Sequence, residues 1–501
     1  MRFVGWMLDV AREQSPSTDW LIQVLKRSES AGYGAVGLYL EHRFAYPSAP
    51  WAAGPGALSP EAVREAIRSA PGVRLIPFLN TLGHMEGFIR SEGGKWLAEG
   101  ASTGSQQACP SNPRVVEFAR GLITDAMDAF SDEWVHLGGD ETWQLGQCAE
   151  CSQRAEKIGK AGIYGEFYGP LCEWVLDRGR RPCLWADMLI EHPDAIRYIP
   201  KQTILFDWHY DKSPVESASQ FREMGFDVVC CPAVHTFDSA WCFLDQTQEN
   251  VDEHAAAAIE TDSLGVLVTT WEYSYFTNYE STLPVIYACG RRLSSGTDWS
   301  DAIRAEGGEE YWRAAEILGN QIPSLSPFLQ KRTWRKFRNA LIFGQNPFYL
   351  WLDWGEEACG SVGDDVIRLC MQVEDLLPEE HPLRFPARLY RSGVEWIRVV
   401  RDAHDQYRAG DLAAARYTLE QGCSWLEGLR PDLERIAAGG GSSADVGRLR
   451  MLVEKVRNVS AKIGEVEATH QGVAHLPSFE RLVHDAYVIG DQAAWRTGQF
   501  R

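Results

Sequence analysis

Short apolar runs alternate with amphipathic stretches over roughly the first 275 residues of the chain. The runs are rich in β-branched and aromatic residues, whereas residues 19–30 and 113–130 between them place apolar side chains on one helical face. Nearly continuous apolar strands that alternate with helices are typical of a parallel sheet covered on both faces. The eight runs comprise residues 3–8, 36–40, 74–79, 134–137, 182–185, 203–206, 227–231 and 266–271.

The number of runs predicts an α/β fold, a closed (β/α)₈ TIM barrel rather than an open doubly wound sheet. No glycine-rich phosphate-binding fingerprint follows the first run, which further disfavours a dinucleotide-binding fold. After about residue 300 the strand-like runs fade and apolar residues recur at helical spacing, as at Leu452, Val456 and Val459. We therefore predict a barrel over residues 1–300 and a mainly α-helical C-terminal domain over residues 301–501.

Composition and charge limit the classes of partner. The formal net charge of -20 argues against a nucleic-acid partner, which usually requires a basic face. The first residues do not show the pattern of a cleavable leader, and no apolar stretch of about 18 residues occurs in the sequence, so no membrane insertion is expected. The 12 cysteines are scattered, some within strand-like runs, which favours reduced thiols in a cytoplasmic protein. A homodimer is one assembly compatible with this chain.

Two cysteines form a lone CxxC motif, Cys148-Ala149-Glu150-Cys151. A zinc site of this type normally combines two such pairs at a characteristic separation, and the chain has no second pair. The sequence therefore predicts no metal ion and no cofactor.

Acids and tryptophans follow nearly every predicted strand. Chemistry in this kind of barrel takes place at the carboxyl ends of the strands. Each of these residues alone is compatible with an ion pair or with packing. Together they predict a sugar-binding pocket, because acids bind hydroxyl groups and indole faces cover the C–H faces of sugar rings. The strand ends carry Asp9, Arg12, Glu41, His42, Gly83, His84, Glu86, Asp140, Glu141, Trp185, Asp187, Asp207, Trp208, His209, Tyr210, Trp271 and Glu272.

One strand end carries two adjacent carboxylates after a glycine pair, in the segment His136-Leu137-Gly138-Gly139-Asp140-Glu141. Neighbouring acids repel each other, so each is expected to face a different part of one substrate. The segment resembles the catalytic motif of glycoside hydrolase family 20, the β-N-acetylhexosaminidases. Three further segments also resemble motifs of this family. Asp9 to Arg12 resembles the Asp-x-x-Arg of the first strand, Gly83-His84 the Gly-His of the third strand, and Trp271-Glu272 the tryptophan and acid of the last strand. The resemblance covers roughly residues 2–290.

The chain also departs from the common pattern of this family. It is similar to the shorter members, which have a helical C-terminal region and lack the α/β domain that commonly precedes the barrel. Trp271 and Glu272 are adjacent here, whereas many members separate the two residues by one position.

The resemblance implies an exo-acting enzyme that removes terminal non-reducing GlcNAc or GalNAc from oligosaccharides or glycoconjugates with retention. In this family the 2-acetamido oxygen of the substrate attacks C1 and forms an oxazolinium intermediate, an exception to the mechanism with two carboxylates across the bond. Glu141 would be the general acid and then the base, and Asp140 would orient the acetamide. His84 and Glu41 would form a relay to Glu141. The implied substrate-binding residues are Arg12, Trp185, Trp208, Tyr210, Trp271 and Glu272, with Tyr210 the candidate for the acetamide carbonyl.

Two other functions remain open from the residues alone. One is a metal-dependent barrel hydrolase in which His84, His136, Asp140 and Glu141 bind the ion. The other is a catalytically silent protein that binds amino sugars, although a binder has no need for a repelling pair of acids. The sequence sets neither the preference between GlcNAc and GalNAc nor the natural aglycone.

Overall fold

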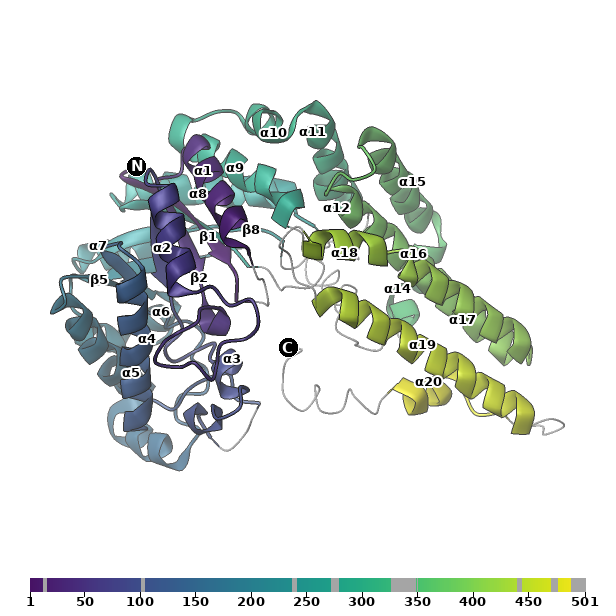
Figure 1. Ribbon diagram of the computed structural model, residues 1–501, viewed down its shortest axis with the longest axis horizontal. Helices are drawn as coiled ribbons and strands as arrows, with labels where there is room; N and C mark the ends of the chain where they lie inside the picture. Colours follow the sequence, from purple (N-terminus) through teal and green to yellow (C-terminus); the bar gives the residue numbers. More distant parts are fainter. Residues whose placement is uncertain are drawn as a thin grey trace. The chain divides into compact units, whose positions relative to one another are not determined.

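The computed structural model contains two compact units (Figure 1). The barrel unit comprises Met1–Val234, Gln246–Trp271 and Val285–Glu306, and the helical unit comprises the rest of the chain. The structure describes residues 1–11, 16–100, 104–236, 241–271, 279–325, 348, 350–438, 444–469 and 476–487. None of the helices in these ranges has the length and apolarity required to cross a lipid bilayer. The predicted domain boundary at residue 300 stays a prediction.

Eight parallel strands close into a barrel, as predicted. β1 pairs with both β2 and β9, which leaves no open edge between the first strand and the last. A two-residue strand, β8 (Ala233–Val234), adds to β9. All eight apolar runs form the barrel strands, with ends shifted by no more than two residues. These are β1 (Phe3–Asp9), β2 (Ala35–Tyr39), β3 (Arg74–Phe78), β4 (Trp134–His136), β5 (Arg181–Trp185), β6 (Ile204–Trp208), β7 (Asp227–Cys231) and β9 (Gly265–Thr270).

Helices follow the strands and lie around them (Figure 1). Their first residues carry the expected caps: the Ser17 hydroxyl accepts a hydrogen bond from Trp20 N at 3.1 Å, and Asn112 precedes Pro113 at the start of α4. The amphipathic residues 19–30 and 113–130 form α1 and α4. The helices are α1 (Thr18–Ser30), α2 (Pro60–Ser69), α3 (Glu86–Ile89), α4 (Pro113–Ala129), α5 (Ala149–Leu176), α6 (Asp187–Glu191), α7 (Val215–Glu223), α8 (Leu244–Glu260), α9 (Tyr279–Ser295) and α10 (Trp299–Gly307), with 3₁₀ turns at Glu41–Arg43, Lys95–Leu97 and Pro193–Tyr198.

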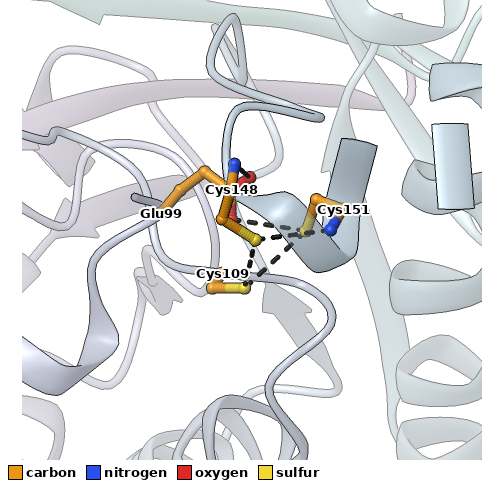
Figure 2. A group of neighbouring side chains, drawn as sticks. All are labelled: Glu99, Cys109, Cys148 and Cys151. Carbon is orange, nitrogen blue, oxygen red and sulfur yellow. Dashed lines mark hydrogen bonds between the residues drawn. The ribbon is translucent and has the colours of Figure 1, made fainter. Parts of the chain in front are cut away.

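Two long connections, from β3 to α4 and from β4 to α5, contact each other at several points. The Gln144 side chain accepts hydrogen bonds from Ser105 Oγ at 2.9 Å and from Gln106 N at 3.0 Å. Gln144 N donates to Gln107 Oε1 at 2.9 Å. Four side chains from the two connections and the first turn of α5 also meet, namely Glu99, Cys109, Cys148 and Cys151 (Figure 2). The two connections therefore hold each other in place.

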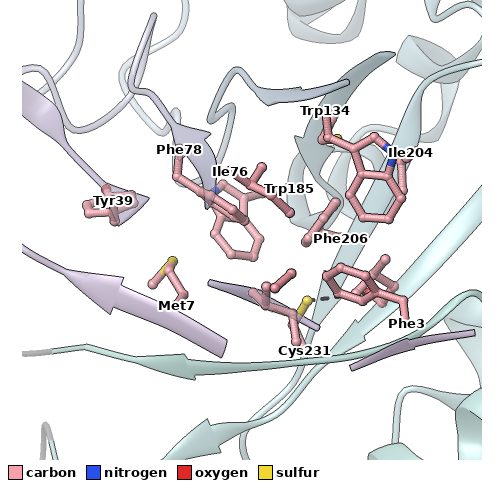
Figure 3. Close-up of a cluster of buried hydrophobic side chains, with 14 of the residues drawn as sticks. Phe3, Met7, Tyr39, Ile76, Phe78, Trp134, Trp185, Ile204, Phe206 and Cys231 are labelled. Carbon is pink, nitrogen blue, oxygen red and sulfur yellow. Dashed lines mark hydrogen bonds between the residues drawn. The ribbon is translucent and has the colours of Figure 1, made fainter. Parts of the chain in front are cut away.

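Large side chains fill the interior of the barrel (Figure 3). Alternate residues of each strand point inward, so that Phe78, Trp185 and Phe206 from three strands contact one another. Trp208 and Trp271 pack against this core at the carboxyl ends of their strands. The interior is thus a packed core that supports the residues at the strand ends.

The helical unit is mainly α-helical, as predicted. The helices predicted from the spacing of apolar residues are confirmed. Val394, Ile397 and Val400 are buried on α16, and Leu452 and Val456 are buried on α19. Helix α17 packs along both α16 and α19 (Figure 1). The remaining elements are α11 (Glu309–Glu316), a π-helical turn (Ile317–Gln321), α12 (Ile322–Ser324), α14 (Leu350–Cys359), α15 (Ser361–Leu376), α16 (Arg384–Arg408), α17 (Leu412–Glu427), α18 (Arg430–Ala438), α19 (Ala444–Thr469) and α20 (Phe479–Tyr487).

Candidate active site

The paired acids follow β4 on a backbone that only glycine allows. Gly138 and Gly139 have φ angles of 80° and 101°. A Cβ atom on Gly138 would lie 2.7 Å from the Leu79 carbonyl oxygen, and one on Gly139 would lie 2.7 Å from Tyr164 Oη. The glycine pair therefore lets the chain turn sharply against β3 and α5. This turn brings Asp140, which is 5% exposed, and the more accessible Glu141 to the end of the barrel.

His84 lies between the two acids. Its Nε2 atom is 3.4 Å from Asp140 Oδ2 and 3.3 Å from Glu141 Oε2. Gly83 makes this approach possible, because a Cβ atom there would lie only 2.3 Å from the Asp140 carbonyl oxygen. The Gly-His pair of the third strand thus fits against the Asp-Glu pair of the fourth.

The surroundings of His84 favour its charged form. Burial opposes the charge, but Tyr39, Asp140 and the hydrogen bonds to both acids together raise the pKa of His84 well above its usual value. The other ring nitrogen, Nδ1, is 4.0 Å from Glu86 Oε1. An imidazolium at this position offsets the repulsion between Asp140 and Glu141.

Glu41, the second member of the expected relay, is buried at the end of β2. Its Oε2 atom is 3.9 Å from Nδ1 of the neighbouring His42. The relay from Glu41 to Glu141 stays a prediction.

Asp187 belongs to the site. The sequence places it at a strand end but assigns it no role. Its Oδ2 atom accepts a hydrogen bond from Glu141 N at 2.9 Å. Burial raises the pKa of Asp187 well above its usual value, and the negative charge of Asp140 adds to this effect. Asp187 therefore fixes the backbone of Glu141. An acid two residues after Trp185, the aromatic end of β5, was the one signal in the sequence that pointed to it.

Three consecutive strand ends carry strained backbone. Glu41, His84 and Glu141 have φ angles of 40°, 51° and 46°, in the left-handed region that non-glycine residues rarely adopt. Asp262 is the only other such residue in the described ranges, apart from the glycines. Strain of this kind persists where the surrounding structure enforces it, and it is concentrated at functional sites.

Aromatic residues from three strands lie beside the acids. Trp208 stacks on Tyr210 with ring centroids 5.1 Å apart, and Trp271 Nε1 donates a hydrogen bond to Tyr210 Oη. Trp271 also contacts Trp185, which is fully buried, at 5.8 Å between ring centroids. Burial raises the pKa of Tyr210 well above its usual value, so its phenol stays protonated. The structure thus groups four of the six residues expected to bind substrate.

The other two, Arg12 and Glu272, lie outside the described residues. Asp9, which begins the Asp-x-x-Arg segment, is fully buried, and its Oδ1 atom accepts a hydrogen bond from Ala11 N at 2.9 Å. The backbone next to Arg12 is therefore fixed by the end of β1.

His136 is part of the barrel core. Its ring stacks on Phe78 at 4.4 Å and contacts Trp185 at 4.5 Å between ring centroids. Burial lowers the pKa of His136 well below its usual value, and its Nδ1 atom accepts a hydrogen bond from Gly138 N at 3.1 Å. A neutral ring that uses Nδ1 in this way stabilises the glycine turn. It is poorly suited to bind a metal ion together with Asp140 and Glu141.

Comparison with known proteins finds a family model that matches much of the barrel. Residues 49–290 match the sequence model of glycosyl hydrolase family 20, catalytic domain. The match covers 242 of the 501 residues, just under half of the chain. This match confirms the resemblance to glycoside hydrolase family 20 over that part of the chain.

Individual relatives are distant. The chain is 22% identical over 193 residues to a β-hexosaminidase of Akkermansia muciniphila, an alignment that covers 36% of each chain, so it spans about a third of that relative. It is also similar to a β-N-acetylhexosaminidase of Bacteroides fragilis, with 17% identity, a TM-score of 0.47 and coverage of 59% and 67% of the two chains. It is similar as well to a chitobiase of Flavobacterium johnsoniae, with 13% identity, a TM-score of 0.49 and coverage of 96% of this chain and 74% of the other.

Proposed function

We propose that the barrel is an exo-acting β-N-acetylhexosaminidase that uses the acetamido group of its substrate as the nucleophile. One observation carries this proposal. Asp140 Oδ1 is buried and has no hydrogen-bond partner among the described residues, while Oδ2 of the same carboxylate faces His84. A buried acceptor without a donor is costly. The N–H of a 2-acetamido group at C2 of the sugar would supply the missing donor.

The placement of Asp140 and Glu141 supports a mechanism in which the substrate supplies the nucleophile. In most retaining glycosidases two carboxylates face each other across the scissile bond. Here a single imidazole nitrogen contacts both Asp140 and Glu141, so the two acids share one side of the site. An internal nucleophile removes the need for a carboxylate on the opposite side. Because it is already in place, it also lowers the entropic part of the barrier.

The first step forms the intermediate. The acetamide oxygen bonds to C1 as the bond from C1 to the leaving oxygen breaks, and Glu141 gives its proton to that oxygen. Asp140 orients the amide and stabilises the positive charge of the oxazolinium. Glu141, whose side chain is 31% exposed, is accessible enough for this proton transfer. The neighbouring imidazolium of His84 stabilises the carboxylate that Glu141 becomes.

The second step hydrolyses the intermediate. Water attacks C1, its proton passes to Glu141, and the bond between C1 and the acetamide oxygen breaks. Two inversions at C1 give overall retention. Trp208 and Trp271 would surround the acetamide methyl group and the sugar ring, the buried Trp185 would support them from the core, and Tyr210 would bind the acetamide carbonyl. Arg12 and Glu272 would bind the hydroxyl groups of a terminal GlcNAc or GalNAc.

The test compares Asp140→Asn with wild type on an aryl N-acetyl-β-glucosaminide, an aryl N-acetyl-β-galactosaminide and an aryl β-glucoside that lacks the acetamide. Wild type should hydrolyse at least one N-acetylated substrate and not the glucoside. Asp140→Asn should lose on the order of 10²-fold or more in kcat, because it no longer holds the amide in position. Exposed Asp194→Asn is the matched control and should retain activity.

Two results would overturn the proposal. Near-wild-type turnover by Asp140→Asn would remove the assisted mechanism. A folded wild type that binds N-acetylhexosamines but hydrolyses none of these substrates would instead be the silent sugar-binding protein.

A further inference from the structure

The lone CxxC motif is joined by two residues that are distant in sequence. Cys109 Sγ is 3.7 Å from both Cys148 Sγ and Cys151 Sγ, and Glu99 Oε2 is 3.3 Å from Cys151 Sγ. The four donor atoms all lie within 4.8 Å of one another. Figure 2 shows the three sulfur atoms and the Glu99 carboxylate pointing toward a common centre. We call these four residues the thiol cluster.

These distances match the edges of a tetrahedral metal site. Thiolate sulfurs bound to zinc at about 2.3 Å are about 3.8 Å apart in a regular tetrahedron. The two measured sulfur–sulfur distances are both 3.7 Å. A disulfide would require about 2.05 Å, and pairing any two of these cysteines would leave the third thiol beside the bridge.

Glu99 gives a second, independent indication of a cation. Its side chain is 1% exposed, and within the described ranges no Lys, Arg or His side chain pairs with it. A buried carboxylate is costly unless it is paired or binds a metal. Its Oε1 atom accepts a hydrogen bond from Cys148 N at 2.8 Å, which leaves Oε2 directed at the sulfurs. A hydrogen bond of this kind orients a metal ligand.

We propose that Glu99, Cys109, Cys148 and Cys151 bind a structural zinc ion. Three thiolates and one carboxylate form a soft, closed set of four ligands, which favours zinc over magnesium or calcium. With no position left for water, the ion would stabilise structure without taking part in a reaction.

The position of this ion would matter for the barrel. Glu99 and Cys109 belong to the β3–α4 connection that carries His84. Cys148 ends the β4–α5 connection that carries Asp140 and Glu141, and Cys151 lies in the first turn of α5. One ion would therefore cross-link the two connections that supply the acids and the imidazole. Cross-linking long loops restricts the unfolded chain and fixes the folded one.

The experiment measures metal content, which requires no substrate. Wild type purified under reducing conditions without chelators is analysed by inductively coupled plasma mass spectrometry, beside Cys109→Ser, Glu99→Gln and Cys172→Ser. Cys172 is buried on α5 outside the thiol cluster, so its variant is the matched control. Wild type and Cys172→Ser should each hold about one zinc ion per chain. Cys109→Ser should lose it, and Glu99→Gln should bind it at least 10-fold more weakly.

A second measurement covers the case in which Cys109→Ser does not fold. Wild type depleted of metal and reloaded with Co²⁺ should show the charge-transfer absorption of thiolates bound to cobalt. Three outcomes would overturn the proposal: reduced wild type that takes up neither zinc nor cobalt, Cys109→Ser with a full complement of zinc, or a Cys148–Cys151 disulfide in most molecules. Zinc in an inactive protein would leave this proposal standing and count only against the proposed hydrolase.

Discussion

The β3–α4 and β4–α5 connections build two polar clusters of different kinds. Near the strands, Asp140, Glu141 and His84 form an acid–imidazole cluster in which a cationic side chain contacts both acids. The thiol cluster brings a buried carboxylate and three cysteines together, and within the described ranges no cationic side chain joins them.

The difference indicates what each cluster lacks. The acid–imidazole cluster contains a cation that offsets part of its negative charge. Its Asp140 Oδ1 atom has no hydrogen-bond partner among the described residues, as expected for a site that is completed by a substrate and released again. The thiol cluster has converging donors and, in the part of the chain that the structure describes, no positive partner, as expected for a site completed by a permanent ion. Backbone strain follows the same division, since φ is positive at His84 and Glu141 and at none of the four thiol-cluster residues.

The largest expected effect comes from Glu141→Gln, which removes the proposed acid and leaves the thiol cluster unchanged. Loss of general acid catalysis costs about 10²–10⁴-fold in kcat when the leaving group requires a proton. The loss should be much smaller on aryl substrates with acidic phenols, because such phenols leave without protonation. Steady-state kinetics across a series of aryl N-acetyl-β-glucosaminides checks this, with zinc content as the control. An equal loss across the whole series would rule out Glu141 as the acid.

The sequence was sufficient to predict the eight barrel strands. Parallel strands in a barrel are buried on both faces, so they appear as continuous apolar runs such as residues 227–231, which form β7 without any shift. The position of the paired acids could also be predicted from the sequence, because Gly138 and Gly139 mark a turn at which the chain leaves the strand. The sequence pattern predicts those features, such as strands and tight turns, that depend on residues close together in the chain.

The contacts between long connections could not be predicted. Cys109 and Cys148 are 39 positions apart, and Glu99 is another 10 positions earlier, so their meeting depends on the path of two loops. The sequence showed a lone CxxC and led to the expectation of no metal. Likewise, the hydrogen bond from Glu141 N to Asp187 joins two strand ends in a geometry that no spacing rule describes.

A smaller effect is expected from Gly83→Ala, which tests how closely the two connections must approach. The new Cβ atom would lie 2.3 Å from the Asp140 carbonyl oxygen, so Asp140 or His84 must move. A displacement of about 1 Å can cost on the order of 10²-fold in rate. Gly34→Ala is the matched control, because its Cβ atom would meet only the Val4 carbonyl oxygen, at 3.8 Å. We expect reduced kcat with retained zinc for Gly83→Ala; unchanged kcat would show that this approach does not position the acids.

The smallest effect concerns stability, through the charge on His84. Because its pKa is raised in the folded protein, its stabilisation is complete below the unfolded pKa of about 6.5 and is lost as pH rises through the higher folded value. His84→Gln should therefore be less stable than wild type by about 1–3 kcal/mol near pH 6, and the difference should shrink at alkaline pH. Urea unfolding at a series of pH values measures this. Tyr39, Asp140, Glu141 and Glu86 face this imidazole, and all four remain in the variant, so the change in the difference with pH reports chiefly on His84. A difference that grows with pH would mean that His84 is neutral in the folded protein, and the two acids would then lack the positive charge that distinguishes their cluster from the thiols.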